Sequence, residues 1–315
     1  MRGLTQEVSL KLDISPPPNQ LRPFAEPAEI TLSLTNPNGT AIENGSVRIQ
    51  LDAPAPGRFF STDFPIVEGT RLVDLSLPIL HGKVRWQYLF PIRGDYRFHV
   101  EAMTSDSKKT AKAFNITIRE RERKWFFLGV FTAALFLAGF VAGRIFTTLT
   151  MGPRNKLMLA VLILVAAFAF FNQKGFTQKT KTDEDAANLE IRLGTVGRLS
   201  QISWHSTETA RKAQPTNLTL KITHLETGKT VFGIDKIPIA EKFLMQFQFT
   251  DGDEYRVESV VDLEKGEPIH SKRLVSIVAV EPPLGASIPA LAFFIAVIGA
   301  GLWAGRRSRY ATGVN

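Results

Sequence analysis

The sequence of 315 residues contains no cysteine, which excludes disulfides, thiolate metal sites and iron–sulfur ligation. It also lacks a His-x-His pair, a Gly-x-Ser-x-Gly nucleophile motif and a glycine-rich phosphate loop after a strand. No ionisable residue lies inside its apolar runs, although proton relays and ion pathways usually need one. These absences argue against an enzyme, a transporter or a redox pump. We therefore expect no catalytic residue and no cofactor.

An export signal is also missing from the first residues. The opening stretch "MRGLTQEVSLKLDISPPP" has no apolar core of a signal peptide. Two explanations stay open: a processed leader is absent from this sequence, or the first apolar run exports the domain before it.

Apolar residues concentrate in three runs, from which we predict membrane helices over residues 125–146, 157–173 and 284–305. A helix needs roughly 20 apolar residues to cross the hydrocarbon core. The second run is short by this measure, but Lys156 at its start can extend along the helix to the interface. The sequence thus predicts three spans.

The net charge of +8 comes with many basic residues placed beside these runs. This placement favours anionic lipid head groups over nucleic acid as the partner of the positive charge. The flanking residues are Arg119, Arg121, Arg123, Lys124, Arg144, Arg154, Lys156, Arg306, Arg307 and Arg309.

The positive-inside rule predicts which segments face the cytoplasm. The loop 147–156 and the tail 306–315 carry basic residues and no acid, so both are predicted to be cytoplasmic. The basic stretch 119–124 lies on the opposite side and counts against this orientation. We expect an integral membrane protein whose soluble domains are extracytoplasmic, in the periplasm.

Residues 1–120 show short runs of alternating apolar residues separated by turn signals such as "SPPPNQ", "NPNGT" and "HGK". Seven such strands at this spacing predict an antiparallel β-sandwich. A polar linker over 174–187 precedes a second alternating region over 188–282, which predicts a second sandwich. The expected fold class is two immunoglobulin-like antiparallel sandwiches with three membrane spans.

Small residues recur at four-residue spacing in two of the predicted spans. Gly139 and Gly143 form one GxxxG motif, and Gly301 and Gly305 form another. Such motifs let helix backbones approach closely. Two interpretations stay open: the glycine faces dock into a larger membrane assembly, or they pack among this chain's own helices.

Metal binding has one weak candidate. His99 and Met103 alternate on one predicted strand, so they share a face, and imidazole with a thioether can hold copper. A single histidine on a strand is more often surface decoration. We therefore predict no metal site, with His99 and Met103 as the residues to watch.

Two stretches resemble each other across the predicted spans, "IRGDYRFHVEA" and "TDGDEYRVESV". Each has a turn rich in Gly and Asp before a tyrosine, Tyr96 or Tyr255, that begins an alternating run. In sandwiches a tyrosine beside such a turn can bury its ring and hydrogen-bond the backbone. We predict that both are structural corners.

The stretch "FAEPAEITLSLTNPNGTAIENGSVRIQLDAP" and the later "GRFFSTDFPIVEG…FPIRGDYRFHVEA" resemble immunoglobulin-like bacterial modules of the YtkA-like kind. "NLTLKITHLETGKTVF…FQFTDGDEYRVESVVDLEKG" is similar to the same plan. Some such modules are associated with copper or oxidase maturation. The His and Met ligands of those modules have no counterparts here, so the resemblance implies a sandwich beside membrane spans.

The order sandwich, two helices, sandwich is similar to the B subunit of copper membrane monooxygenases. That subunit's copper ligands, an amino-terminal histidine and a His-x-His pair, are missing, and the third span is extra. The resemblance implies the architecture only. The sequence predicts a non-catalytic accessory or assembly subunit that contacts integral membrane partners, and the alternative is a copper-handling module for oxidase or monooxygenase maturation.

Overall fold

The computed structural model describes residues 8–57, 60–104, 109–146, 188–192, 195–206, 214–239, 241–282 and 284–312. The chain divides into two compact units, one of β-strands and one of helices. The strands come from residues up to 120 and from 188–276, and the helices from 122–146 and 284–312.

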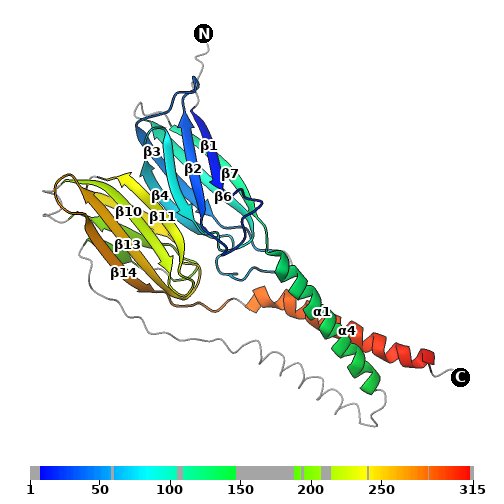
Figure 1. Cartoon of the computed structure of the whole chain (residues 1–315). Coiled ribbons are helices and arrows are strands. Elements are labelled where there is room, and N and C mark those ends of the chain that lie inside the picture. The colour runs from blue at the N-terminus through cyan, green and yellow to red at the C-terminus, as the bar shows by residue number, and fades with distance from the viewer. Residues whose placement is uncertain are drawn as a thin grey trace. The chain divides into compact units, whose positions relative to one another are not determined.

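The N-terminal half of the β unit contains seven antiparallel strands (Figure 1). They are β1 (Ser9–Ser15), β2 (Ala28–Thr35), β3 (Gly45–Asp52), β4 (Arg71–Pro78), β5 (Lys83–Tyr88), β6 (Gly94–Thr104) and β7 (Lys109–Ile118). Strands β1, β2 and β5 lie in one sheet, and β7, β6, β3 and β4 lie in the other.

The C-terminal half repeats this plan with another seven strands. They are β8 (Leu189–Arg192), β9 (Ser200–His205), β10 (Pro215–His224), β11 (Lys229–Pro238), β12 (Lys242–Phe247), β13 (Glu254–Leu263) and β14 (Ile269–Ser276). Its first, second and fifth strands pair in one sheet, and its seventh, sixth, third and fourth pair in the other, as in the N-terminal half.

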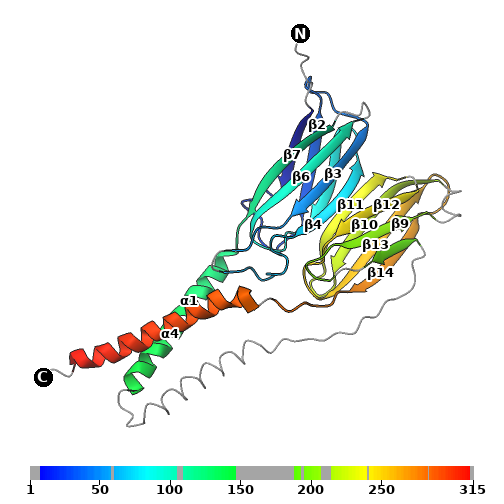
Figure 2. The ribbon, with the colours of Figure 1, turned by 180° about the vertical axis from the view of Figure 1, so that it is seen from behind.

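The two halves share both of their sheets, which the sequence did not predict. The fifth strand of the N-terminal half, β5, pairs with the fourth of the C-terminal half, β11. Likewise the fourth strand, β4, pairs with the fifth, β12. The junction therefore has a two-fold character, because each half presents the same two strands. Two seven-stranded sheets result, seen from opposite sides in Figures 1 and 2.

A single apolar core runs through both halves between the sheets. Alternation places it: in β2 every second side chain is buried, and the same holds for β5. Trp86 lies in the core of the N-terminal half and Trp204 in that of the C-terminal half, both almost fully buried.

Short antiparallel strands are present in both predicted regions. The apolar run 274–280 predicts the last strand there, whereas β14 lies at Ile269–Ser276. Residues after 276 pair with no strand and lead towards the helix. The apolar alternation continues past the strand's end, and the pattern alone could not show where pairing stops.

The helical unit contains α1 (Glu122–Phe146) and α4 (Leu284–Thr312). Each includes a stretch long and apolar enough to cross a membrane, Glu122–Ile145 and Gly285–Ser308. The third predicted span, 157–173, lies outside the described residues, as do the loop 147–156 and the linker 174–187. Helix α4 continues past the predicted end at 305 into the basic tail.

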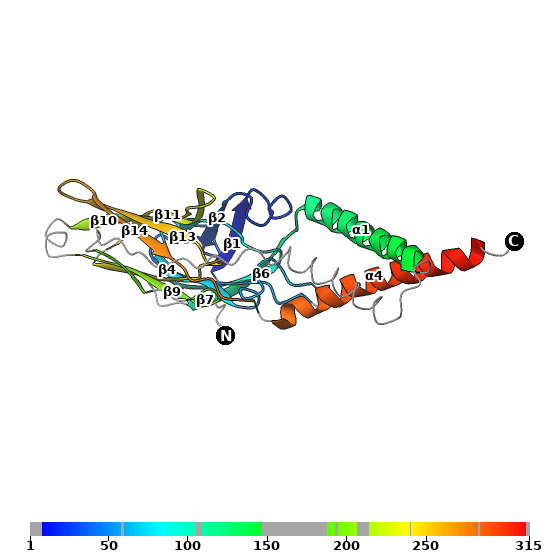
Figure 3. The ribbon, with the colours of Figure 1, turned by 90° about the horizontal axis from the view of Figure 1, so that it is seen from below.

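The two described helices, whose ribbons are seen in Figure 3, pack against each other. Their glycines form the contact. A Cβ added to Gly139 or Gly143 would collide with main-chain carbonyls of Ile298 or Leu302. Reciprocally, the carbonyls of Phe136 and Phe140 occupy the space beside Gly301 and Gly305. Of the two interpretations of the GxxxG motifs, packing within the chain is the one these contacts show.

Candidate functional site: a buried histidine among carboxylates

His224 ends strand β10, and Tyr255 lies directly opposite it near the start of β13. The hairpin turn after β10 supplies Glu226, and the loop before β13 supplies Asp251 and Asp253. In antiparallel neighbours the end of one strand meets the start of the other, so both segments gather at one end of the sheet. The His224 side chain is only 2% exposed.

Both ring nitrogens of His224 have partners. Nε2 lies 3.1 Å from a carboxylate oxygen of Asp251 and 3.3 Å from one of Asp253. The backbone N–H of Thr227 donates to Nδ1 at 3.3 Å, and the Thr227 hydroxyl lies 3.2 Å from the same atom. An N–H aimed at Nδ1 makes it an acceptor, so the neutral ring carries its proton on Nε2 and donates it to the carboxylates.

Opposing influences act on the pKa of His224. Burial of the ring is the largest, and it lowers the pKa because a buried charge loses its hydration. The hydrogen bond to Asp251 and the charges of Asp251, Asp253 and Glu226 act the other way. Together they outweigh burial, so the pKa of His224 is raised above its ordinary 6.5. The protonated ring is favoured by its acidic surroundings.

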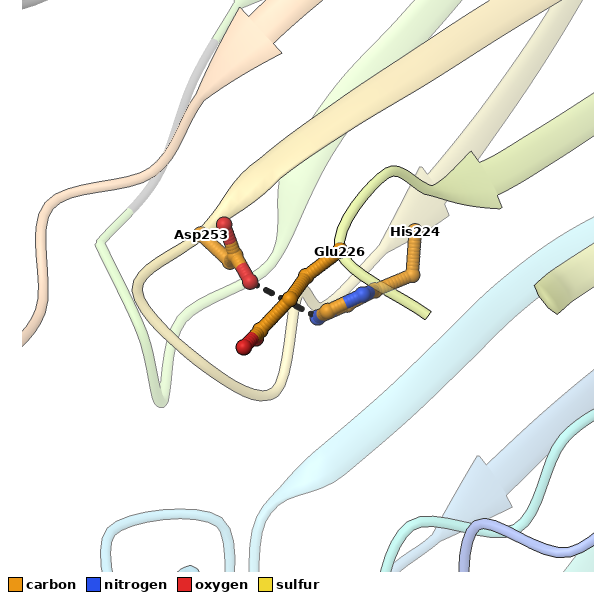
Figure 4. Close-up of side chains that lie close together, drawn as sticks. All are labelled: His224, Glu226 and Asp253. Carbon is orange, nitrogen blue, oxygen red and sulfur yellow. Dashed lines mark ion pairs between the residues drawn. The ribbon is translucent and has the colours of Figure 1, made fainter. Parts of the chain in front are cut away.

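The same cluster could in principle hold a divalent metal ion. One ligand atom each from His224, Glu226 and Asp253 lies within 4.8 Å of the others (Figure 4). A metal on Nε2 would require the proton on Nδ1. The Thr227 hydroxyl could accept that proton, but the Thr227 N–H would lose its acceptor, and the contacts of Nε2 with Asp251 and Asp253 would have to be given up. The geometry fits an internally hydrogen-bonded cluster better than a metal centre.

Tyr255 links this cluster to the core. Its ring is buried and lies edge-on to His224, with ring centres 5.0 Å apart. Its hydroxyl donates to Asp251, four residues earlier, so Asp251 accepts from both Tyr255 and His224. Burial, and next the charge of Asp251, raise the pKa of Tyr255 well above its usual range. The phenol is a neutral donor at physiological pH.

Tyr96 occupies the equivalent place in the N-terminal half, near the start of β6. Its buried hydroxyl donates to the carbonyl of Ile92 at 2.7 Å and accepts from the Ile92 N–H at 2.9 Å. We call Tyr96 with Ile92 the N-terminal corner and Tyr255 with Asp251 the C-terminal corner. Burial raises the pKa of Tyr96 well above its usual value, chiefly by removing the phenol from water.

Glycines explain the shared turn before each tyrosine. Gly94 has a φ of +124°, and a Cβ there would collide with Pro54. A Cβ on Gly252 would collide with the main chain of Ala279. Neither turn has room for a side chain at its glycine, because Gly94 faces the ring of Pro54 and Gly252 faces the main chain of Ala279.

The C-terminal corner also touches the N-terminal half. The ring of Phe24, before β2, lies edge-on to His224 with centres 6.5 Å apart. Lys229, at the start of β11, donates from Nζ to the carbonyls of Phe24 and Ala25, each at 2.7 Å. The histidine cluster thus lies where the two halves meet.

The residues considered for copper are placed elsewhere. His99 lies on β6 with Nε2 3.3 Å from a carboxylate oxygen of Asp52, and Met103 is 46% exposed further along the same strand. Arg71 also binds Asp52, so His99 belongs to a charged cross-strand network. In the described ranges, the cluster at His224 is the group of metal-ligating side chains that comes together, and neither His99 nor Met103 takes part.

Sequence reasoning missed the histidine cluster, although a signal for it was present. In this topology the turn between the third and fourth strands of a half lies beside the loop before the sixth. A histidine at the end of "KITH", directly before the turn "LETG", must therefore meet the acids of "TDGDE". Pairing those two segments required the strand order.

Comparison with known proteins finds no matching family model and no matching curated protein. Solved structures do match, among them a two fibronectin type-III domain segment from chicken tenascin. It is 8% identical with a TM-score of 0.22, and the match covers 84% of this chain and 97% of that one. The fold class is shown by the strand order itself, which is that of two immunoglobulin-like sandwiches.

Proposed function

We propose that this chain is a membrane-anchored, non-catalytic accessory or assembly subunit of a larger membrane protein complex. The helices anchor it, and the fused sandwiches hold a rigid surface for protein partners. The sequence resemblance to YtkA-like modules, which often lie beside membrane spans, agrees with this role.

The observation that carries the proposal is the surface of the helix pair. Most of the large apolar side chains that are exposed in the described residues belong to α1 and α4. They include Trp125, Phe126, Phe127, Val130, Phe136, Leu137, Val141, Ile145, Ile288, Leu291, Phe293, Ile295 and Trp303. Such a shell needs lipid or protein around it. Because the glycine faces are used between α1 and α4, partners in the membrane would contact the other faces.

The proposed orientation is supported by charges near the C-terminal ends of the helices. Arg144 lies in the last turn of α1, and Arg306 and Arg307 lie near the end of α4. Basic residues at these ends favour the cytoplasmic side and its anionic lipid head groups. Under this proposal both halves of the β unit are extracytoplasmic, in the periplasm.

The copper-handling alternative gains no specific support. Its candidate histidine, His99, pairs with Asp52. The buried histidine, His224, is surrounded by carboxylates, whereas thioether and thiolate sulfurs are the ligands that select Cu(I). We therefore propose the accessory role alone.

The proposal is tested by extracting the full chain from its native membrane in mild detergent and running native electrophoresis. We expect the chain to migrate in an assembly much larger than its own mass. A chain that migrates as a monomer under the mildest extraction would contradict the proposal. Protease added to intact cells with permeabilised outer membranes tests orientation, and protection of the β unit would refute it.

A further inference from the structure

The β unit can lie on only one side of a membrane. Its two halves share both sheets, because β5 pairs with β11 and β4 pairs with β12. An open sheet cannot continue through the hydrocarbon core, since its edge strands would find no water there to satisfy their backbone groups. Both halves therefore lie on the same side of any membrane that the helices cross.

Both described helices lead away from this unit along the chain. Helix α1 begins at Glu122, shortly after β7, and α4 begins at Leu284, after β14. If each helix crosses the membrane once, their last residues, Phe146 and Thr312, lie on the far side. Strand β8 begins at Leu189, which belongs to the β unit again. The chain must therefore cross back between α1 and β8.

The connection between α1 and β8, residues 147–187, lies outside the described residues, and its apolar part is the run 157–173. A segment that crosses lipid has to be helical, because only a helix satisfies its own backbone there. A helix over this run would extend about 25 Å, which is less than the hydrocarbon thickness of about 30 Å. A span this short gains from association with neighbouring helices.

Helix α4 has an outer face that suits such a neighbour. Gly301 and Gly305 face α1, whereas Ala292, Ala296 and Gly299 lie on the opposite side of α4 at about 100° per residue and are exposed. A Cβ on Gly299 would meet no atom within 4 Å. Small residues on this face let the backbone of another helix approach closely.

The outer face of α1 is bulkier. Val130, Leu137 and Val141 lie on the side of α1 away from Gly139 and are 52%, 59% and 52% exposed. Side chains of this size hold another helix backbone at a greater distance than alanine and glycine do. Between the two outer faces, that of α4 therefore permits the closer helix contact.

We propose that residues 157–173 cross the membrane as a return helix and pack on the outer face of α4, which Ala292, Ala296 and Gly299 form. The inference rests on the membrane anchoring in the proposed function and assigns an occupant to one face of the helix pair. It leaves the outer face of α1 for lipid and for partner subunits.

The chain has no cysteine, so introduced pairs of cysteines report the contact without background. Ala296→Cys, near the middle of the apolar stretch of α4, is combined in turn with a cysteine at each of positions 163–166, about one helical turn. Ala134→Cys, exposed near the middle of the stretch in α1, replaces it as the matched control. The full chain is oxidised in its native membrane with copper phenanthroline, and free thiols are measured by maleimide labelling after denaturation. Ala292→Cys with positions 167–170 repeats the test if Ala296→Cys folds poorly.

We expect one or two of the four positions to lose most of their free thiols with Ala296→Cys, because one side of the return helix faces α4, and none to do so with Ala134→Cys. The disulfide should form within single chains on a non-reducing gel. Disulfides with Ala134→Cys alone, or with neither helix, would overturn packing on α4.

The crossing itself is tested with Thr148→Cys and Thr180→Cys, which lie on either side of the run 157–173. An impermeant maleimide added to intact cells with permeabilised outer membranes should label Thr180→Cys and leave Thr148→Cys unlabelled. Any other pattern overturns the return helix and leaves the accessory role standing. If alkaline carbonate releases the wild-type chain from the membrane, the anchoring in the proposed function fails, and the return helix fails with it.

Discussion

The two tyrosine corners occupy equivalent strands of the two halves and are satisfied in different ways. In the N-terminal corner, Tyr96 bonds the backbone of Ile92. In the C-terminal corner, Asp251 occupies the position equivalent to Ile92, four residues before the tyrosine. Its carboxylate accepts the hydrogen bond from the Tyr255 hydroxyl. The repeat is one of fold, and its chemistry has diverged.

The position opposite each tyrosine shows the same divergence. His224 lies opposite Tyr255 in the strand register. The pairing of β3 with β6 ends at Asp52 and Arg97, and the next residue, opposite Tyr96, is Ala53. The C-terminal half thus places an imidazole and a carboxylate, His224 and Asp251, where the N-terminal half has the apolar Ala53 and Ile92. We therefore expect the C-terminal corner to depend on pH and the N-terminal corner not to, although their sequences look alike.

Asp251→Ala should produce the largest effect. It removes the acceptor shared by Tyr255 and His224, and we expect unfolding free energy to fall by about 3 kcal/mol because two buried donors lose a charged partner. Urea unfolding of the full chain in detergent, followed by tryptophan fluorescence, measures it; Trp86 and Trp204 report on the β core, and Trp125 and Trp303 on the helices contribute a background. Asp95→Ala is the control, since this exposed aspartate should matter by less than about 0.5 kcal/mol. Equal losses of unfolding free energy in Asp251→Ala and Asp95→Ala would contradict the difference between the two corners.

Tyr96→Phe and Tyr255→Phe compare the corners directly. Tyr96→Phe leaves the buried N–H and C=O of Ile92 without partners, and we expect a loss of about 2 kcal/mol at every pH. Tyr255→Phe should lower the unfolding free energy by about 1 kcal/mol, because the Asp251 carboxylate still accepts from His224 and is partly exposed to water. The same urea titrations, repeated at several pH values, give both numbers. A larger loss for Tyr255→Phe would reverse the order we predict.

The pH dependence of stability should come from His224. Its pKa is raised in the folded state, so its stabilising effect is complete below the unfolded value of about 6.5 and is lost as pH rises through the folded value. The stability difference between wild type and His224→Gln should therefore be greatest at acid pH and shrink in alkaline solution. His99→Gln is the control. A difference that grows with pH would contradict the sign.

Thr227→Ala should have the smallest effect. The hydroxyl can accept a proton from Nδ1 of the charged ring, while the Thr227 backbone N–H can satisfy only the neutral ring. We expect a loss of about 0.5 kcal/mol at acid pH and less in alkaline solution. Paired urea titrations at the two pH extremes measure it. A loss that is independent of pH would show that the Thr227 hydroxyl stabilises the turn and not the charged His224 ring.

Much of the fold was open to prediction because local rules control it. Alternation placed the strands, and turn residues separated them, as between β4 and β5 or β10 and β11. The joining of β4 to β12 and of β5 to β11 was hidden, because no local pattern distinguishes an edge strand that stays free from one that pairs with another half. The GxxxG motifs were found, but their partners required the structure.

The site was harder to predict than the fold. Both tyrosines were singled out from the repeated turn, but His99 was preferred to His224 because it had a methionine on its face. His224 gains its importance from Asp251 and Asp253, which lie 27 and 29 residues further along the chain. Such contacts follow from strand order, and sequence spacing carries no sign of them.

The most direct test of the central claim is an NMR titration of the His224 ring in the full chain in detergent, beside the same titration in Asp251→Asn. The account predicts a His224 pKa above 6.5 in the wild type and a lower one in the variant, with the proton of the neutral ring on Nε2. A wild-type pKa at or below 6.5, or one that does not respond to Asp251→Asn, would show that the C-terminal corner is no more sensitive to pH than its N-terminal counterpart.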